Sequence, residues 1–454
     1  MNCETDVLVI GGGPAGITFS LMVKKLDPSI QVTMFRPESH SVVYCAIPYA
    51  IEGLFEPEKV LKDDAMVTGS GVELVYKKII SIDLLSRKVV TEDGDSCHFR
   101  RLFIATGATP ARPPVPGIEA ENVFTVKTKK DMDCLIDKLN SGVKRAVVVG
   151  AGAIGIEQAQ AYRARGVEVD LIEMANHILP NLIDTDMSVQ AQQALVDQGI
   201  RLRLGTRLDR LETAGALVTR VVLDNGENIE LDPAYDFVTV CTGMLPDIQL
   251  FHDQGLAVSR DGILVDACMR TNLPEVYAAG DCCAFFSGID GKPVAGKLAT
   301  NAVPMGKIAA RCMLGQPVEH EGFINGAATC AGPYRVGGTG FTEAEARRRG
   351  FAIYTGYGNT TSFFPMMPGT TEVLVKIVAD LATDRILGGQ VVARTPTTDK
   401  VDVITLAIQQ KLTVQQLARL SYSAQPWQSF LPARNPIVEA CETALSGKNK
   451  QAAA

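Results

Sequence analysis

The chain has 454 residues, of which 46% are hydrophobic and 21% charged, and its net charge is −7. This length exceeds one ordinary hydrophobic core and predicts about three domains. The acidic balance lacks the basic surface that nucleic acid binding requires, and no apolar run reaches the roughly 18 residues of a membrane span. We therefore expect neither a nucleic acid partner nor a membrane partner.

Eleven cysteines are scattered along the chain without the spacing of a disulfide framework. Such usage is typical of the reducing cytoplasm, so we expect a cytoplasmic protein in which most cysteines are small buried residues. The opening MNCETDVLVIGGG lacks the basic and long apolar regions of a signal peptide. Five scattered histidines, with no ordered Cys/His cluster at zinc spacing, predict no metal site.

The first predicted elements are an apolar strand, a glycine turn and a helix, in DVLVIGGGPAGITFSLMVKK (6–25). Gly11 permits the tight turn, Gly13 lets the backbone approach a pyrophosphate, and Gly16 allows close helix–strand packing. The N-terminus of the helix supplies N–H groups to the phosphates. The second strand ends in Arg36, where an acid is expected; Arg36 could stack on an adenine or meet a phosphate, and both alternatives stay open.

A lone cysteine follows in SVVYCAIPYAIEG (41–53). Cys45 has no partner at CxxC or CxxxxC spacing. We expect it to open a helix that continues through AIPYAIEG, with Pro48 tolerated in the first turn. A helix N-terminus together with nearby positive groups lowers a thiol pKa from about 8.5 into the range of roughly 3.5 to 7.5. Cys45 is therefore our candidate redox nucleophile.

The stretch RLFIATGATPARPPVPG (101–117) predicts a buried strand, a turn with Thr106 and Gly107, and a proline-rich crossover to another domain. Further along, DFVTVCTGMLPD (236–247) repeats the strand and the turn at Gly243 and would return the chain to the first domain. In EVYAAGDCCAF (275–285), Gly280 and Asp281 follow a buried strand, where an aspartate could bind a ribityl hydroxyl. The adjacent Cys282 and Cys283 are expected to be reduced.

The order of strand, glycine turn and helix recurs in KRAVVVGAGAIGIEQAQAYRARGVEVDLIEM (144–174), with Gly150, Gly152 and Gly155. The next strand ends at Glu173, 23 residues after Gly150. An acid there accepts hydrogen bonds from the ribose 2′-OH and repels a 2′-phosphate, which favours NADH over NADPH. Two dinucleotide folds in one chain predict a flavin and a nicotinamide that exchange a hydride.

The C-terminal part predicts a β-hairpin in TEVLVKIVADLATDRILGGQVVA (371–393) and a helix over VDVITLAIQQKLTVQQLARL (401–420). The residues after 446 are small and polar, which is typical of a frayed tail.

Several motifs occur in a fixed order over about residues 5 to 441: GGGPAG, YCAIPYAIEG, ATGATP, GAGAIGIE, AAGDCC, LATNAVPMGKIAA and SYSAQPW. With them the chain resembles the pyridine nucleotide–disulfide oxidoreductases. It looks most like the single-cysteine branch of coenzyme A–disulfide reductases, NADH oxidases and peroxidases, and NADH-dependent persulfide or polysulfide reductases. The resemblance implies an α/β fold with two Rossmann-like dinucleotide-binding domains plus a C-terminal α+β dimerisation domain, and hence a homodimer. The implied division is an FAD-binding domain (1–112 and 245–325), an NADH-binding domain (113–244), a dimerisation domain (326–446) and a frayed tail (447–454).

The resemblance also implies site residues. Cys45 would form a mixed disulfide with coenzyme A, or a persulfide, in the sulfur route and a sulfenic acid in the oxygen or peroxide route. Relatives that handle oxygen usually carry a histidine where this chain has Pro14, which favours sulfur; His40 is a possible substitute. Tyr422 matches a tyrosine that reaches the partner's cysteine and protonates the leaving thiolate, whereas Phe364 stands where a second tyrosine is usual.

Coenzyme A binding is implied only in part, because relatives often carry several arginines on the first helix. Lysines remain as candidate ligands for its phosphates at Lys24, Lys25 and Lys62, and Arg434 is a further candidate. Ala153 replaces an aromatic residue that often shields the flavin.

The sequence therefore predicts an FAD-dependent NADH oxidoreductase that reduces a small disulfide, persulfide or polysulfide through Cys45. One alternative is an NADH oxidase or peroxidase that uses the same cysteine as sulfenic acid. A second alternative is a flavoprotein reductase that passes electrons to an acceptor protein and has no use for Cys45.

Overall fold

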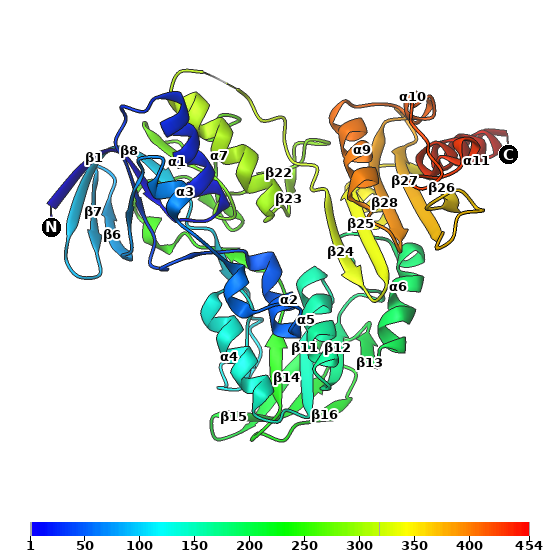
Figure 1. Ribbon diagram of the computed structural model, residues 1–454, viewed down its shortest axis with the longest axis horizontal. Coiled ribbons are helices and arrows are strands. Elements are labelled where there is room, and N and C mark those ends of the chain that lie inside the picture. Colours follow the sequence, from blue (N-terminus) through cyan, green and yellow to red (C-terminus); the bar gives the residue numbers. More distant parts are fainter. Residues whose placement is uncertain (1, 317, 454) are drawn as a thin grey trace.

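The apolar run before the first glycine turn forms β1 (Asn2–Ile10), a central strand of a seven-stranded sheet. The computed structural model describes residues 2–316 and 318–453 (Figure 1). The strand order is β5-β2-β1-β8-β7-β6, and β21 pairs with β8. β1 runs parallel to β2 and β8, whereas β7 runs antiparallel to both of its neighbours, β6 and β8. The other strands of this sheet are β2 (Val32–Phe35), β5 (Glu73–Val75), β6 (Ile79–Asp83), β7 (Lys88–Thr91), β8 (Ser96–Ile104) and β21 (Val276–Ala278).

Two long helices cover this sheet and pack side by side, α1 (Pro14–Leu26) and α7 (Ala299–Met313) (Figure 1). A Cβ built on Gly306 of α7 would lie 2.6 Å from the carbonyl oxygen of Ala15, so the two helix backbones are in contact. The remaining short elements around this unit are β3 (Ser41–Val42), β4 (Leu61–Lys62), α3 (Ala65–Thr68), β19 (Val258–Ser259), β20 (Gly262–Ile263), β22 (Phe285–Phe286) and β23 (Pro293–Val294).

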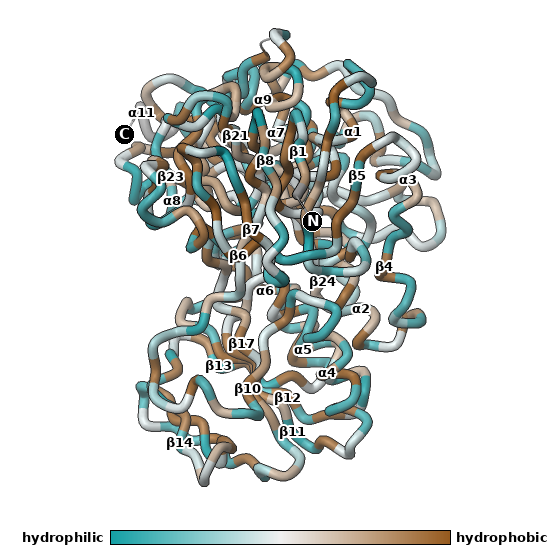
Figure 2. Tube along the Cα trace, turned by 90° about the vertical axis from the view of Figure 1, so that its left-hand side faces the viewer, coloured by the Kyte–Doolittle hydropathy of each residue, from teal (hydrophilic) through white to brown (hydrophobic). Residues whose placement is uncertain are grey.

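The second glycine turn belongs to a separate five-stranded parallel sheet with the order β10-β17-β11-β12-β13. Hydrophobic stretches run along the central strands of the sheets (Figure 2). A three-stranded antiparallel sheet, β14-β15-β16, shares a hydrophobic cluster with the parallel sheet. The elements are β10 (Val123–Phe124), α4 (Lys129–Asn140), β11 (Arg145–Val149), α5 (Ala153–Ala164), β12 (Glu168–Glu173), α6 (Thr185–Asp197), β13 (Ile200–Leu204), β14 (Leu208–Ala214), β15 (Leu217–Leu223), β16 (Asn228–Glu230) and β17 (Phe237–Val240).

Two short antiparallel strands connect the units, as the two crossover sequences predict. β9 (Ala108–Pro110) pairs with β18 (Met244–Pro246), so the chain leaves and re-enters the first unit at one place. The first sheet thus combines strands from both segments that we assign to the flavin domain.

Helix α2 (Ile47–Glu52) departs from a simple division of the chain. It comes from the first 112 residues, yet it packs against α4 and α5 of the second unit (Figure 1). Ile47, Ala50 and Ile51 are buried in the same hydrophobic cluster as Met132 and Ile156. The segment after Cys45 is therefore part of the core of the second unit.

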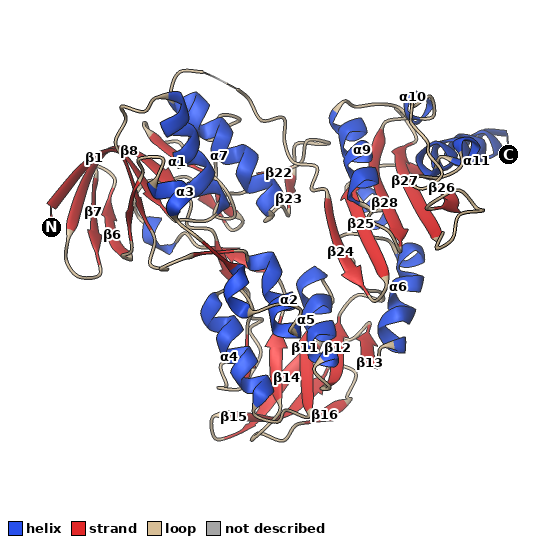
Figure 3. Cartoon of the chain, in the orientation of Figure 1, coloured by secondary structure: helices blue, strands red, loops and turns tan. Residues whose placement is uncertain are grey.

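The C-terminal unit is a five-stranded antiparallel sheet with the order β24-β25-β28-β27-β26, with helices packed on it (Figure 3). The predicted hairpin is confirmed as β27 and β28, joined by a turn. The elements are β24 (Ala327–Ala331), β25 (Tyr334–Gly340), α8 (Glu343–Arg348), β26 (Ile353–Thr361), β27 (Glu372–Asp380), β28 (Ile386–Ala393), α9 (Thr398–Gln409), α10 (Val414–Leu417) and α11 (Pro436–Ala453).

The helical spacing of apolar residues over 401–420 belongs to two helices, α9 and α10, and not to one. α9 ends at Gln409, Lys411 has a φ of 54°, and Thr413 starts α10 with a capping box that includes Gln416. The left-handed conformation of Lys411 interrupts the run of helical backbone hydrogen bonds, and the cap at Thr413 begins a new helix. At the end of the chain, α11 continues through residues 447–453, where we expected a frayed tail. This stretch is rich in alanine and lysine, which favour helix; Ala454 lies outside the described residues.

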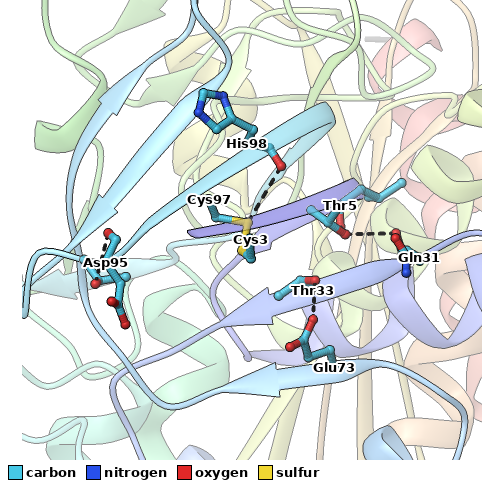
Figure 4. Close-up of a disulfide and its surroundings, with 10 residues drawn as sticks. Cys3, Thr5, Gln31, Thr33, Glu73, Asp95, Cys97 and His98 are labelled. Atoms are coloured by element: carbon cyan, nitrogen blue, oxygen red, sulfur yellow. Dashed lines mark hydrogen bonds between the residues drawn. A yellow bond between two sulfur atoms is a disulfide. The ribbon is translucent and has the colours of Figure 1, made fainter. Parts of the chain in front are cut away.

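A disulfide joins Cys3 of β1 to Cys97 of β8, with their Cα atoms 4.5 Å apart (Figure 4). The expectation of unpaired cysteines therefore fails for these two, because the parallel pairing of β1 with β8 places them directly opposite each other. The other nine cysteines are free, and five of them are buried, including Cys282 and Cys283, as expected.

A buried lysine connects the second unit to the C-terminal unit. Lys376 of β27 is 1% exposed, and its Nζ lies 3.1 Å from Asp184, 2.9 Å from Asp186 and 2.6 Å from Glu343. Asp184 and Asp186 belong to the start of α6, and Glu343 to the start of α8. One ammonium group therefore holds three carboxylates from two units.

None of the helices in the described residues combines the length and the apolar character that a bilayer crossing needs.

Candidate active site

The first glycine turn has the shape of a phosphate cradle. Gly11 has a φ of +108°, and a Cβ on it would lie 2.1 Å from the carbonyl oxygen of Ala105. A Cβ on Gly16 would lie 2.0 Å from the oxygen of Gly11. A Cβ on Gly13, at the start of α1, meets nothing within 4 Å. Two glycines thus permit tight packing, and the third leaves open space in front of the helix N–H groups, which suits a dinucleotide pyrophosphate.

The second glycine turn repeats this geometry. Gly150 has a φ of +103° and packs on the carbonyl oxygen of Cys241, with a built Cβ 2.5 Å away. A Cβ on Gly155 would lie 1.8 Å from the oxygen of Gly150, and one on Gly152 meets nothing within 4 Å. The chain therefore presents two cradles, one at the start of α1 and one at the start of α5.

The carboxylate of Glu173 lies at the second turn. It is 7% exposed and accepts hydrogen bonds from the backbone N–H of Ala151 at 2.8 Å and of Ala175 at 2.9 Å. These bonds fix the carboxylate at the end of β12, beside the glycine turn. The position fits an acceptor for ribose hydroxyls.

Arg36 occupies the corresponding place in the first unit and is 2% exposed. Its guanidinium forms an ion pair with Asp64, donates to the carbonyl of Glu38 at 2.9 Å, and lies 5.4 Å from the centre of the Tyr76 ring. Its side chain also packs on Gly12, where a Cβ would meet the Arg36 Cδ at 2.4 Å. Nη1 is buried and has no hydrogen bond partner among the described residues. Arg36 thus packs against the glycine turn, and the N–H bonds of its Nη1 atom can donate to a ligand.

A cavity of about 390 Å³ adjoins this ion pair. Lys62 and His40 line it together with Ser39, Leu61, Asp63, Asp64 and Tyr76. His40 is exposed and hydrogen bonded to Ser39 at 2.9 Å, in agreement with a loop position.

Thr106, Gly107 and Asp281 lie where β8 and β21 end next to each other. The Thr106 hydroxyl donates to the carbonyl of Asp247 at 2.5 Å, and Gly107 has a φ of 78°. Gly280 packs on α1, with a built Cβ 3.1 Å from the Cβ of Ala15. Gly243, between β17 and β18, has a φ of 116°, and a Cβ built on it meets nothing within 4 Å. The turn at Thr106 and Gly107 and the turn at Gly243 therefore both lie at the edge of the first sheet.

Two lysines that the sequence did not single out flank Asp281. Lys127 donates to the carbonyl of Ala108 and lies 5.7 Å from the centre of the Tyr44 ring, next to Cys45. Lys297 donates to the carbonyl of Asp281 at 2.6 Å. Burial lowers the pKa of both lysines, and the Asp281 charge opposes that shift. Burial also raises the pKa of Asp281, against the pull of the two lysines. The sequence signal for Lys127 is its place directly after the mostly apolar stretch VFTV (123–126).

Cys45 is exposed and lies in a 3₁₀ turn over Tyr44–Ala46. The prediction that it opens the helix is wrong in detail. Ala46 is the N-cap of α2, Pro48 lies in its first turn, and the helix has only six residues. A helix this short provides a small dipole, so the structure gives no basis for thiol activation by the helix alone.

Tyr422 lies between α10 and α11, is 41% exposed, and donates to the carbonyl of Pro432 at 2.6 Å. This region is well separated from α2 (Figure 1), so one chain does not bring Tyr422 to its own Cys45. The backbone N–H of Phe364 donates to the carbonyl of Pro426 at 3.1 Å, which places Phe364 in the same region.

The lysines proposed for coenzyme A differ in their surroundings. Lys24 donates to the carbonyls of Pro28 at 2.6 Å and Ile30 at 2.9 Å, so its ammonium group closes the end of α1. Lys25 and Lys62 are exposed. Arg434 is paired with Glu439. Only Lys25 and Lys62 therefore present free surface for an anion.

Comparisons with known proteins cover nearly the whole chain. A family model described as pyridine nucleotide-disulphide oxidoreductase matches residues 5–306, and a model of the dimerisation domain of that family matches residues 327–431. The NAD(P)H sulfur oxidoreductase (CoA-dependent) of Pyrococcus abyssi is 30% identical, over 96% of this chain and 98% of that protein. The NADH oxidase of Methanocaldococcus jannaschii is 29% identical with the same coverage. The structure of an NAD-dependent persulfide reductase from A. fulgidus superimposes with a TM-score of 0.92 at 28% identity, covering 99% of this chain and 84% of that one.

Proposed function

Because the chain belongs to the pyridine nucleotide-disulphide oxidoreductase family, we propose that it is an FAD-dependent NADH oxidoreductase that reduces a disulfide, persulfide or polysulfide through Cys45. When bound, FAD and NAD(P)H supply the two-electron chemistry of the family. The cradle at Gly13 and the spare N–H of Arg36 would hold the flavin dinucleotide, and the cradle at Gly152 the nicotinamide dinucleotide. The observation that carries the proposal is an exposed thiol, Cys45, just before a helix that comes from the first unit and packs into the core of the second unit.

The proposed reaction is a thiol–disulfide exchange followed by reduction. The Cys45 thiolate attacks a disulfide RSSR, forms Cys45–S–S–R, and releases RS⁻. Two electrons and a proton from NADH then break the mixed disulfide and give RSH and the Cys45 thiolate. The sum is NADH + H⁺ + RSSR → NAD⁺ + 2 RSH. A persulfide reacts in the same way, with sulfide as the released group.

The coenzyme preference rests on Glu173. Its carboxylate is buried and fixed by two backbone N–H groups, so it cannot turn away from a 2′-phosphate. NADH is therefore the favoured reductant, and NADPH is disfavoured by charge repulsion.

Coenzyme A is the proposed carrier of the sulfur substrate, supported by the relative that is named CoA-dependent. Lys25 and Lys62 are the proposed contacts for its phosphates, whereas Lys24 is already bound to carbonyl groups. Lys62→Ala should raise the KM for coenzyme A disulfide and leave the KM for NADH unchanged. An unchanged KM for coenzyme A disulfide contradicts this contact.

The active unit is proposed to be a homodimer, supported by the match to the family's dimerisation domain. Tyr422 would serve the Cys45 of the partner chain as the acid for the leaving thiolate. Sedimentation of the purified protein measures the dimer. Mixing Cys45→Ser chains with Tyr422→Phe chains tests the shared site, because only mixed dimers would pair an intact Cys45 with an intact Tyr422.

A second candidate function is NADH oxidase, which the relative of that name favours. In this reaction Cys45 would cycle through sulfenic acid. Pro14, at the first position of α1, offers no proton donor where relatives that handle oxygen usually carry histidine. Sulfur is therefore preferred over oxygen.

The deciding experiment is anaerobic NADH oxidation with coenzyme A disulfide, coenzyme A persulfide and polysulfide, and in parallel with peroxide and with oxygen. Cys45→Ser should lose sulfur turnover and keep bound flavin, while Cys134→Ser, the other exposed free cysteine, should match the wild type. If the wild type turns over only peroxide or oxygen, and Cys45→Ser loses that activity, the result supports the oxidase. Equal activity of Cys45→Ser and wild type supports a reductase of an acceptor protein and contradicts the proposal.

A further inference from the structure

A half-buried carboxyl group lies where the three structural units meet. Glu157 belongs to α5, and its Oε1 accepts a hydrogen bond from the Thr329 hydroxyl at 2.7 Å and from the Tyr49 hydroxyl at 3.4 Å. Thr329 belongs to β24 of the C-terminal unit, and Tyr49 to α2, the helix that follows Cys45. One oxygen atom therefore links the thiol segment, the nicotinamide unit and the dimerisation unit.

Helix α5, which carries Glu157, is held to β24 on one side and to α2 on the other. Gln160, also on α5, donates to the carbonyl of Cys330 at 2.9 Å and accepts from the N–H of Gly332 at 2.6 Å, which holds β24 to the helix. On the other side, α2 packs on α5 through the buried faces of Ile47 and Ile51. Glu157 supplies a polar contact between the two helices at the Tyr49 end, and Arg165 at the end of α5 donates to the carbonyl of Ile51 at 3.3 Å.

The place of Glu157 along the helix connects it to the proposed reaction. It lies one turn after Ala153, which begins α5 beside the open cradle at Gly152. Tyr49 lies four residues after Cys45, so a shift of α2 moves the thiol. We propose that Glu157 is a positioning residue that holds the Cys45 segment in register with the nicotinamide cradle. This inference rests on the proposed function.

The groups that face Glu157 are neutral: Tyr49 from α2 and Thr329 from β24 donate hydrogen bonds to it, and the Cys241 thiol after β17 is close enough to feel its charge. Burial raises the pKa of Glu157, against its two hydrogen bonds. Burial, with the Glu157 charge second, raises the pKa of Cys241 to about 12. Both hydrogen bonds end on the single oxygen Oε1, and the side-chain carbonyl of a glutamine can accept them in the same way, so glutamine is a close substitute.

The test measures flavin reduction by NADH in anaerobic rapid mixing of the FAD-loaded enzyme, and hydrogen exchange of the α2 amides without NADH. Glu157→Ala should slow the limiting rate by about tenfold or more, because small displacements of reacting groups cost up to about 10² in rate. The Kd for NADH should stay within about threefold, because the cradle is untouched. The α2 amides should exchange faster. Glu157→Gln should restore both properties, and Glu121→Gln, an exposed glutamate of the same unit, should change neither.

Thr329→Val keeps the side-chain shape and removes the shorter hydrogen bond to Glu157, so it should show part of the effect of Glu157→Ala. It keeps the proposal testable if the Glu157→Ala protein does not fold. The limiting rate of the wild type should vary with pH as the carboxyl ionises, and that of Glu157→Gln should not. The proposal is overturned if Glu157→Ala and Thr329→Val both keep the wild-type rate and exchange, or if Glu157→Gln is as slow as Glu157→Ala. Wild type that reduces its flavin but no sulfur compound contradicts the proposed function alone.

Discussion

The Lys376 cluster allows a stability prediction from the structure. In Lys376→Met the aliphatic stem is largely kept, and the charge that holds Asp184, Asp186 and Glu343 is removed. Loss of one partner from a buried ion pair costs about 3–5 kcal/mol. Asp184 is 10% exposed and stays buried, whereas Asp186 is 44% and Glu343 25% exposed, so water can reach both. We therefore expect the lower end of the range, about 3 kcal/mol.

Urea unfolding followed by tryptophan fluorescence measures this loss, because the single tryptophan, Trp427, lies in the C-terminal unit. With a denaturant slope of about 2 kcal/mol per M, 3 kcal/mol shifts the midpoint by about 1.5 M. Lys129→Met removes the surface pair with Asp133 and should cost about 0.3–0.5 kcal/mol. A shift below about 0.5 M for Lys376→Met refutes the reasoning, because the three carboxylates would then need no cation.

The remaining predictions concern other parts of the chain. Denatured, unreduced protein should show nine titratable thiols, and Cys3→Ser should lower the unfolding free energy by up to about 4.7 kcal/mol, because its bond to Cys97 spans 94 residues; eleven thiols would rule out the bond. Glu173→Gln should lower the kinetic preference for NADH over NADPH about tenfold, or about 1.4 kcal/mol, and an unchanged ratio argues against the ribose contact. Gly152→Ala should keep the wild-type Tm, because its methyl group meets nothing within 4 Å, yet raise the KM for NADH about tenfold; equal KM values would mean that phosphates do not approach there. Bonds from Lys376 and Tyr357 lower the pKa of Asp186 despite its burial, so the stability advantage of wild type over Lys376→Met should shrink as pH falls below 3.8, and a constant advantage in acid titration contradicts this.

The sequence predicted the parts of the site that depend on local backbone geometry. Gly11 and Gly150 need positive φ, and both have it. Glu173 follows Gly150 at a fixed spacing because one helix and one strand separate them, and its carboxylate accepts a hydrogen bond from the N–H of Ala151 in the turn. The pattern of glycine, helix and strand fixes these contacts within about 25 residues.

Contacts between distant segments were not predictable in this way. Tyr49 and Thr329 meet Glu157 across 108 and 172 residues, and no spacing rule relates them. The pairing of Arg36 with Asp64 depends on how the loop after β2 folds back over the glycine turn. Lys127 reaches Ala108 only because β9 and the start of α4 lie together.

Local errors have local causes. The apolar spacing over 401–420 is helical on both sides of Lys411, and periodicity alone does not detect a single left-handed residue. Similarly, the motif around Cys45 suggested one helix, but the chain forms a 3₁₀ turn before α2 begins at Ile47.

The packing of α2 limits how far this protein can be divided into modules. A nicotinamide domain excised as residues 113–244 would lose Ile47, Ala50 and Ile51 from its core and expose the faces of α4 and α5 that they cover. The first domain, freed of its insert, would carry an apolar helix with nothing to pack on. Exchange of coenzyme-binding domains between family members, or truncation to one nucleotide site, must therefore carry this helix along. Cys45, the proposed redox thiol, lies just before this helix and would travel with it.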